Sequence, residues 1–414
     1  MSGTSPAAEP PAAPPPAGDI GRSPLVGRRV AGIDVARGVA LLSMMTVHIL
    51  PGTDDLGRVS TAYVLFSGRA SALFAVLAGV GLALLTGGAH RRLSPGTRAA
   101  VLTRALLIAA LGMALVALQP PVAVILTNYG LLFAVAVPFL HVRRRVLVVT
   151  AAAWLALAPL LSHLLREGRP VGPGDQPSFA DLADPLDLLD RLVLIGYYPV
   201  LTWTPYLLVG LAVGRTPLGS RATALRLLVG GVALAVVARA VSTVLLAAGG
   251  WEALVRSGPA DVVLPEFGAS EVQLRGDFGA PPTTTWWWQA IAAPHSGTPF
   301  DLAHTIGSAL AVIGLALLLV QLAARWRGGG GRLARGALAA LAATGSTTLS
   351  LYSLHVLVMA TGVSAAYPTE SLLLQFAAVL GLASLWRSAA PRGPLEQAVA
   401  SASGAVRDVV GRQR

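Results

Sequence analysis

Apolar stretches of the length needed to cross a lipid bilayer recur along most of this chain. A helix rises about 1.5 Å per residue, so roughly 20 apolar residues span the hydrocarbon core of a membrane. Because a backbone in lipid must satisfy its own hydrogen bonds, such stretches fold as helices. We therefore predict an all-α, polytopic membrane protein with about ten transmembrane helices. The predicted spans lie at about 30–50, 67–86, 99–118, 122–140, 146–165, 193–214, 223–248, 302–324, 336–360 and 370–386.

The composition supports a membrane location. Hydrophobic residues make up 54% of the chain and charged residues 12%, whereas roughly a quarter of the residues in soluble domains are charged. The net charge is +11, but the basic residues occur in short runs between apolar stretches and form no continuous patch. We expect the lipid bilayer, and no nucleic acid, as a partner. The absence of cysteine excludes disulfides and an acyl-cysteine intermediate.

The basic runs predict how the helices are oriented. All 31 basic residues are arginines, and most of them fall on one side of the predicted spans. The positive-inside rule makes that side the cytoplasm, and an even number of spans places both termini there. We expect the protein in an inner or plasma membrane that it crosses several times. Two longer acidic loops, at about 166–192 and 249–301, fall on the extracytoplasmic side.

Three regions follow one another along the chain. Residues 1–27 are rich in Pro and Ala without an apolar run, which predicts a disordered cytoplasmic tail. They also lack the apolar segment of a signal peptide. Residues 28–388 form the predicted transmembrane domain, and residues 389–414 form a cytoplasmic C-terminal tail.

Ionisable residues in the first predicted span indicate function, because a charge at the bilayer centre costs at least about 2.5–3.5 kcal/mol. Asp34, Arg37 and His48 share one face of this helix, with His48 roughly 21 Å along the axis from Asp34. Asp34 and Arg37 form either a local ion pair or, through Arg37, a contact with the phosphates of an anionic donor. His48 is either a helix–helix hydrogen-bonding group or a catalytic acid or base.

Most of the other histidines lie in the predicted outer half of the membrane or in the outer loops, namely His163, His295, His304 and His355, whereas His90 and His141 fall in cytoplasmic turns. No two of the seven histidines have a short metal-ligand spacing, so no metal is expected. His295, Asp301 and His304 lie just before or within the start of a predicted helix and are further catalytic candidates, although Asp301 is also a candidate helix cap. Arg69, at the start of the second span, is a candidate for substrate binding or for structural ion pairing.

Three segments carry motifs. Residues 32–48 read GIDVARGVALLSMMTVH, residues 125–132 read ILTNYGLL, and residues 345–355 read GSTTLSLYSLH. They are similar, in turn, to the patterns D-x-x-R-G-x-A-L-x-x-M-x-x-x-[HN], I-L-x-x-Y-[GA] and G-x-x-[TS]-L-[ST]-x-Y-x-x-[HQ]. These are patterns of the transmembrane acyltransferase superfamily that includes heparan-α-glucosaminide N-acetyltransferase and the YeiB-like bacterial membrane proteins. The chain thus resembles that superfamily over nearly all of its membrane region, with the first motif the most specific.

The resemblance implies transfer of an acyl group, typically acetyl, from cytosolic acetyl-CoA to a hydroxyl or amine of an extracytoplasmic glycan, lipid or other small acceptor. It also implies that His48 takes the position of the family's catalytic His or Asn. A heparan-type acceptor is not expected. We take seven residues of the motifs and the second span as candidates for substrate or acyl-CoA binding: Asp34, Arg37, Arg69, Asn128, Tyr129, Tyr352 and His355.

The residues alone leave two classes of function open, and a third possibility, a scaffold without chemistry, would leave the buried charges unexplained. In an acyltransferase, His48 or His295 takes the acceptor's proton during direct attack on the thioester, or a histidine carries the acyl group. In a transporter or exporter of a small polar or lipidic solute, the same polar face is a pathway, and prolines in or beside the spans break the helices. A homodimer is compatible with either function.

Overall fold

The computed structural model describes residues 30–87, 93–168, 176–257, 268–276 and 279–412. Within these ranges the fold is helical, and the β pairing is an isolated bridge between Thr53 and Val59. The predicted tail at 1–27 and parts of both long loops lie outside the described residues. The α-helices are α1 (Ala31–Ile49), α2 (Thr61–Phe66), α3 (Arg69–Thr86), α4 (Pro95–Val116), α5 (Leu126–Ala136), α6 (Arg144–Leu165), α7 (Pro185–Asp190), α8 (Val200–Val213), α9 (Arg221–Leu245), α10 (Trp251–Ser257), α11 (Ala269–Arg275), α12 (Pro299–Arg325), α13 (Gly328–Ser346), α14 (Thr348–Ala360), α15 (Val363–Ala366), α16 (Pro368–Ala389) and α17 (Pro394–Arg412).

These helices confirm the prediction of an all-α polytopic membrane protein. In the described part of the chain, 7 helices are long and apolar enough to cross a membrane, or 9 if each of two bent pairs is one span. One bent pair joins Pro185–Ile195 to α8 at 62°, and the other joins α13 to α14 at 78°. The remaining predicted span corresponds to a shorter apolar helix, Leu126–Phe139. Each of the ten apolar stretches is therefore helical, but three of them are short or bent.

Helix α1 packs at the centre of the bundle, against α3, α12, α13, α14 and α16. Its close approach to α13 depends on glycines, since a Cβ on Gly38 would collide with the backbone carbonyl of Leu341. In the same way, a Cβ on Gly345 of α13 would collide with the carbonyl of Asp34. Small residues are the usual means by which membrane helices approach closely. This contact brings the first and third motifs together.

The outer helices present apolar side chains away from the core. Large exposed aliphatic residues lie on α4, α6, α9 and α16, for example Leu106, Val149, Val229 and Leu374. In a soluble protein such a surface would be an aggregation hazard, whereas lipid tails solvate it. The exposed surface therefore agrees with a bundle embedded in a bilayer.

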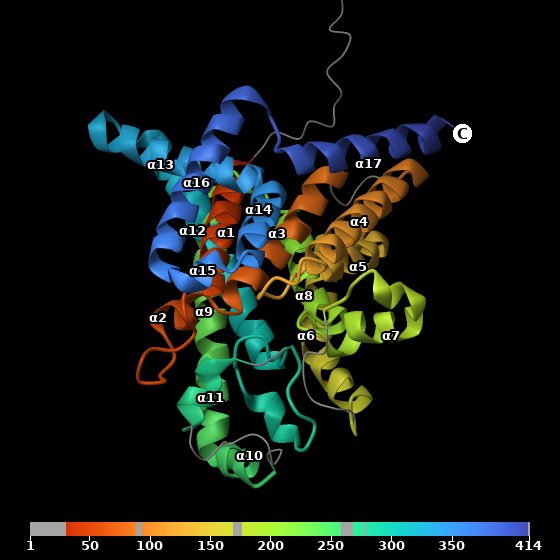
Figure 1. Cartoon of the computed structure of the whole chain (residues 1–414), viewed down its shortest axis with the longest axis vertical. Coiled ribbons are helices and arrows are strands. Elements are labelled where there is room, and N and C mark those ends of the chain that lie inside the picture. Colours follow the sequence, from red (N-terminus) through yellow and green to blue (C-terminus); the bar gives the residue numbers. More distant parts are fainter. Residues whose placement is uncertain (1–29, 88–92, 169–175, 258–267, 277–278, 413–414) are drawn as a thin grey trace, which may run out of the picture.

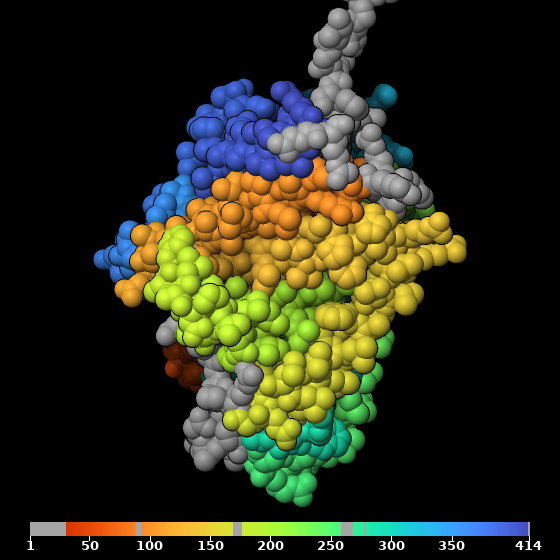
Figure 2. All heavy atoms as spheres, turned by 90° about the vertical axis from the view of Figure 1, so that its right-hand side faces the viewer, coloured from red at the N-terminus to blue at the C-terminus, as the bar shows by residue number. Residues whose placement is uncertain are grey.

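Helix α17 lies across one end of the bundle, whereas α10 and α11 lie at the opposite end (Figure 1). On the face shown in Figure 2, blue α17 lies directly above orange α4, and the atoms of α6 lie further down. The region predicted only as a C-terminal tail thus contains a 19-residue helix packed on the membrane domain.

Candidate active site

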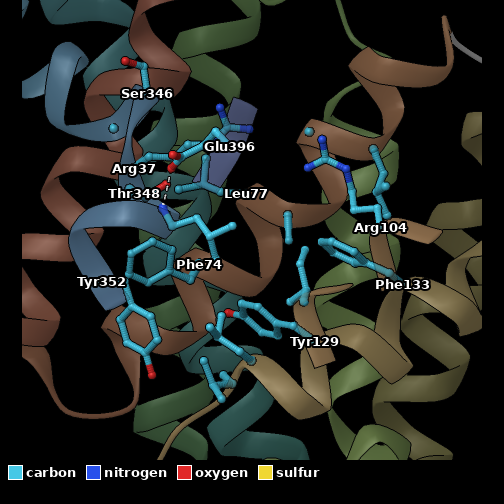
Figure 3. A pocket seen from close by; sticks show the side chains of 18 of the residues that line it. Arg37, Phe74, Leu77, Arg104, Tyr129, Phe133, Ser346, Thr348, Tyr352 and Glu396 are labelled. Carbon is cyan, nitrogen blue, oxygen red and sulfur yellow. Dashed lines mark hydrogen bonds between the residues drawn. The ribbon is translucent and has the colours of Figure 1, made fainter. Parts of the chain in front are cut away.

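A cavity of about 300 Å³ lies between α1, α3, α4, α5 and the bend between α13 and α14, with α17 at its edge. Most of its wall is apolar and includes Phe74 and Leu77 (Figure 3). In the view of Figure 3, charged side chains lie in the upper part of the cavity and the hydroxyphenyl rings of Tyr129 and Tyr352 lie below them. The cavity therefore has a charged end and a more apolar, tyrosine-lined end.

At the charged end, Arg37 forms the ion pair that the sequence offered as one interpretation. Its Nη1 atom lies 3.0 Å from Oδ1 of Asp34, one helical turn earlier on α1. Arg37 also lines the cavity. One guanidinium can hold a carboxylate with some of its five N–H groups and present others to an anion, so the two predicted roles of Arg37 are compatible.

Arg104, from the middle of α4, is a second cation in the cavity wall, and it belongs to none of the three sequence motifs. Its Nε atom is buried, with no hydrogen-bond partner among the described residues. Two further arginines, Arg37 and Arg392, and one carboxylate, that of Glu396, lie close enough to interact with its charge. An incompletely neutralised arginine in a membrane helix is costly and usually functional. The sequence feature that indicates a role for Arg104 is its position as a lone arginine inside a predicted span.

Glu396 of α17 caps the amino-terminal end of α14. Its Oε1 atom accepts hydrogen bonds from the backbone N–H groups of Leu349, at 2.6 Å, and Ser350, at 3.3 Å. Its Oε2 atom accepts a third from the Ser350 hydroxyl, at 2.6 Å. A carboxylate is favourable at this position because the first N–H groups of a helix lack partners within the helix. Glu396 thereby ties α17 to the edge of the cavity.

Beyond the tyrosine-lined end, two histidines meet. His48 lies one turn after Met44, which lines the cavity, and His355 lies one turn after Tyr352. Nδ1 of His48 is 3.0 Å from Nε2 of His355, and the two ring planes are inclined by 12°. Nδ1 of His355 is in turn 2.8 Å from Oε1 of Gln375 on α16. The helix–helix hydrogen bond that was one of the two interpretations of His48 is therefore present, beside the end of the cavity.

His295 lies near this pair, in the segment that precedes α12. It is close enough that a charge on one of the two rings would act on the other, and its ring meets that of Tyr198 edge-on at 5.9 Å between centroids. Its Nδ1 atom is buried, with no hydrogen-bond partner among the described residues. Burial lowers the pKa of His295 to about 4, because desolvation disfavours the charged imidazolium. His295 is therefore neutral at pH 7.

His304 and Arg69 lie elsewhere, in a hydrogen-bonded network that does not line the cavity. Nε2 of His304 is 2.8 Å from Nη2 of Arg69, and its Nδ1 is 2.9 Å from the carbonyl oxygen of Ala235. Because Arg69 and the carbonyl occupy both ring nitrogens, His304 donates from Nδ1 and accepts at Nε2. Arg69 is held by hydrogen bonds to His304 and, at 2.6 Å, to the carbonyl oxygen of Val64; these contacts are structural, but they are not the ion pair that was one of its two interpretations.

Asp301 stabilises the start of α12 together with Thr298. The N-cap residue is Thr298, whose hydroxyl accepts from the N–H of Asp301 at 3.1 Å. Oδ2 of Asp301 in turn accepts from the N–H of Gly297 at 3.0 Å. Such reciprocal bonding resembles a capping box. The cap of α12 is therefore Thr298 and not Asp301, which supports the helix start from the first turn.

Two polar residues of the second motif have different positions: Tyr129 lines the cavity, and Asn128 holds a neighbouring segment. Tyr129 lines the cavity, and its hydroxyl donates to the carbonyl of Ser71 at 3.2 Å. Asn128 points away and donates from Nδ2 to the carbonyl of Tyr198 at 3.0 Å. Asn128 thus fixes the segment that carries Tyr198, which is the ring that contacts His295.

Comparison with known protein families identifies the family to which the chain is similar. Residues 29–240 match the sequence model of a family described as "Heparan-alpha-glucosaminide N-acetyltransferase, catalytic". No curated protein and no solved structure matches the chain. The matched region includes α1, α3, α4 and α5, which form much of the cavity, and it ends before α14, α16 and α17.

Proposed function

This chain belongs to the heparan-alpha-glucosaminide N-acetyltransferase catalytic family, and we propose that it transfers an acetyl group from cytosolic acetyl-CoA to an acceptor outside the cell membrane. The acceptor is a hydroxyl or amine of a glycan, a lipid or another small molecule. The observation that carries the proposal is the position of the cavity, which has arginines at one end and ends one helical turn from His48 and His355.

The cavity suits the chemical parts of an acyl-CoA. Arg37 and Arg104 supply N–H groups for phosphate oxygens, which guanidinium groups bind well. The apolar wall between these arginines and Tyr352 suits the uncharged pantetheine arm. In this arrangement the phosphates stay toward the arginine-rich, cytoplasmic side and the thioester reaches toward the histidines.

His48 is the proposed catalytic base, and His295 is the second candidate for that role. The acceptor's oxygen or nitrogen attacks the carbonyl carbon of the thioester while its proton passes to an imidazole nitrogen. The C–S bond then breaks, and the departing sulfur takes up the proton to leave free CoA. An imidazole can accept this proton only while it is neutral, and the low pKa of His295 keeps that ring neutral at pH 7.

An acetyl-transfer assay in sealed vesicles tests the proposal. The purified protein is reconstituted, radiolabelled acetyl-CoA is supplied on the side of the arginine-rich loops, and label is measured in amino sugars and polyols on the other side. We expect transfer by the unaltered protein and by a His141→Ala control, since His141 is exposed. A His48→Ala, His295→Ala double variant should lose transfer. Full transfer by that variant would refute the catalytic assignment.

A transporter is the second candidate function, and the bent helices favour it. The 78° bend between α13 and α14 lies beside the cavity, and broken helices form the binding sites of many transporters. Ligand-dependent stability separates the two functions, because a ligand stabilises the native state that binds it. Thermal stabilisation by acetyl-CoA supports the transferase, whereas stabilisation by transported solutes without acetyl-CoA dependence supports the transporter.

A further inference from the structure

Gln375 lies behind the two histidines and contacts two serines as well as His355. Its Oε1 atom is 2.8 Å from Nδ1 of His355. Its Nε2 atom is 3.1 Å from the hydroxyl of Ser364 and 2.9 Å from that of Ser371. The two hydroxyl oxygens are themselves 2.9 Å apart. Gln375, Ser364 and His355 are all buried, so each of these contacts needs a proton between its two atoms.

Counting protons fixes which end of the Gln375 amide faces His355. The three contacts among the amide and the two hydroxyls need three protons. With the NH₂ group toward the serines, two amide protons and the Ser371 hydroxyl proton supply them. With the carbonyl oxygen toward the serines, only two hydroxyl protons are present for three contacts. Because amide orientations are assigned from such networks, the serine pair places the carbonyl oxygen toward His355.

This orientation determines the tautomers of both histidines. A carbonyl oxygen only accepts hydrogen bonds, so Nδ1 of His355 carries a proton. In a neutral ring, Nε2 of His355 is then an acceptor, and the proton between the rings belongs to Nδ1 of His48. Nε2 of His48 is consequently left with a lone pair, which is what a general base requires.

We propose that Gln375 is a positioning residue that holds His48 in its Nδ1–H tautomer through His355. The proposal rests on the proposed function, in which Nε2 of His48 takes the acceptor's proton. Ser364 and Ser371 act one step further back, by preventing the amide from turning over. If the amide turned, His48 would present an N–H group where the reaction needs a lone pair.

Histidine side-chain ¹⁵N NMR of the full-length protein in nanodiscs tests this assignment without donor or acceptor. His48 and His355 signals are identified by loss in the single His→Ala variants. We expect both rings to carry their proton on Nδ1 in the unaltered protein. Gln375→Leu, which removes the acceptor, should give a mixture of His48 tautomers. A His48 that carries its proton on Nε2, or one that Gln375→Leu does not change, would overturn the proposal.

Ser371→Ala separates positioning from packing, because it leaves the Gln375 side chain in place. With one hydroxyl gone, either orientation of the Gln375 amide satisfies the remaining contact with Ser364. His48 should therefore again be present as a mixture of its two tautomers. In contrast to Gln375→Leu, the variant Gln375→Glu keeps an acceptor oxygen for His355, so His48 should stay in its Nδ1–H form. Gln321→Leu, a partly exposed glutamine on α12, is the matched control. A Ser371→Ala protein with an unchanged His48 tautomer would contradict the proton count.

Acetyl-transfer kinetics supply the second measurement. Locking a catalytic histidine in its wrong tautomer costs about 10⁴-fold in rate in a serine protease, so a mixture should cost less, roughly tenfold or more. We expect Gln375→Leu to lower kcat and leave KM for acetyl-CoA unchanged, because Gln375 does not line the cavity. A raised KM with unchanged kcat would contradict the positioning role. Absence of transfer by the unaltered protein would refute the proposed function. The NMR test of the His48 tautomer would still apply, because it needs neither donor nor acceptor.

Discussion

Nδ1 of His48 lies 3.0 Å from Nε2 of His355, although 307 positions separate the two residues in the chain. The first residue ends the first motif and the second ends the third. The matched family region stops at residue 240, so His355 reaches the site from outside it. The bend between α13 and α14 makes this meeting possible, because it lets α13 pack along α1 while α14 borders the cavity.

Arg104→Met should weaken donor binding without destabilising the protein. If the guanidinium binds a phosphate through charge-assisted hydrogen bonds worth about 1.5–3 kcal/mol, KM for acetyl-CoA should rise roughly 10- to 150-fold. In the absence of donor, the melting temperature should stay constant or rise, since the substitution removes an incompletely neutralised buried charge. Kinetics and thermal unfolding in detergent measure the two effects.

Arg332→Met is the matched control for that experiment, because Arg332 is exposed on α13. It should change neither KM nor the melting temperature. If Arg104→Met instead lowered the melting temperature and left KM unchanged, the guanidinium would have a structural role only.

The helices could be predicted from the sequence because length and apolar content decide whether a segment spans a bilayer. The Asp34–Arg37 pair could be predicted too, since residues three apart on a helix are neighbours. The bend at Thr347 could not, because the α13–α14 junction contains no proline to mark it. Helix α17 was missed because its composition, with few large apolar residues, gives no membrane signal.

The contacts within the candidate site were harder to foresee. His48 was identified from its own helix, but its partner His355 depends on how two distant helices pack. Gln375 is uncharged, so its position within a predicted span did not indicate a costly buried charge. Arg104 did indicate such a charge, and a rule that flags every arginine inside a span would have found it.

Gly38→Ala should destabilise the contact between α1 and α13. The added Cβ would meet the carbonyl of Leu341, and overpacking of this kind typically costs about 1–3 kcal/mol. Because α1 also carries His48, acetyl transfer should fall as well. Gly336→Ala on α13 is the control, since a Cβ there meets nothing; it should be neutral or slightly stabilising through helix propensity. Equal melting temperatures for the two variants would contradict this packing.

Glu396→Gln should loosen α17 from the edge of the cavity. The substitution removes the negative charge from the α14 amino terminus and retains one acceptor oxygen, so the expected loss is about 1 kcal/mol of stability. Thermal unfolding measures that loss, and limited proteolysis near residue 390 should become faster. Gln397→Ala, an exposed neighbour, should have no effect. Proteolysis that is equally fast in both variants would mean that the Glu396 cap does not hold α17.

His295→Asn should flatten the dependence of stability on pH in mildly acidic solution. Burial lowers the pKa of His295 to about 4 in the folded protein, whereas an unfolded histidine titrates near 6.5. Between these values the unfolded chain binds a proton that the native protein does not. The His295 contribution to stability is therefore present above about pH 6.5, falls as the pH decreases toward 4, and changes no further below that.

Asparagine suits this test because His295 has a left-handed backbone, with φ of 62°, and Asn tolerates that conformation better than most residues. Melting temperatures of the unaltered protein and the variant are compared from pH 4 to pH 8. The difference between them should be constant above pH 7 and should shift in favour of the variant as the solution becomes more acidic. A constant difference over the whole range would mean that His295 titrates alike in the folded and unfolded states, and its proposed role as a neutral, buried base would then lose its support.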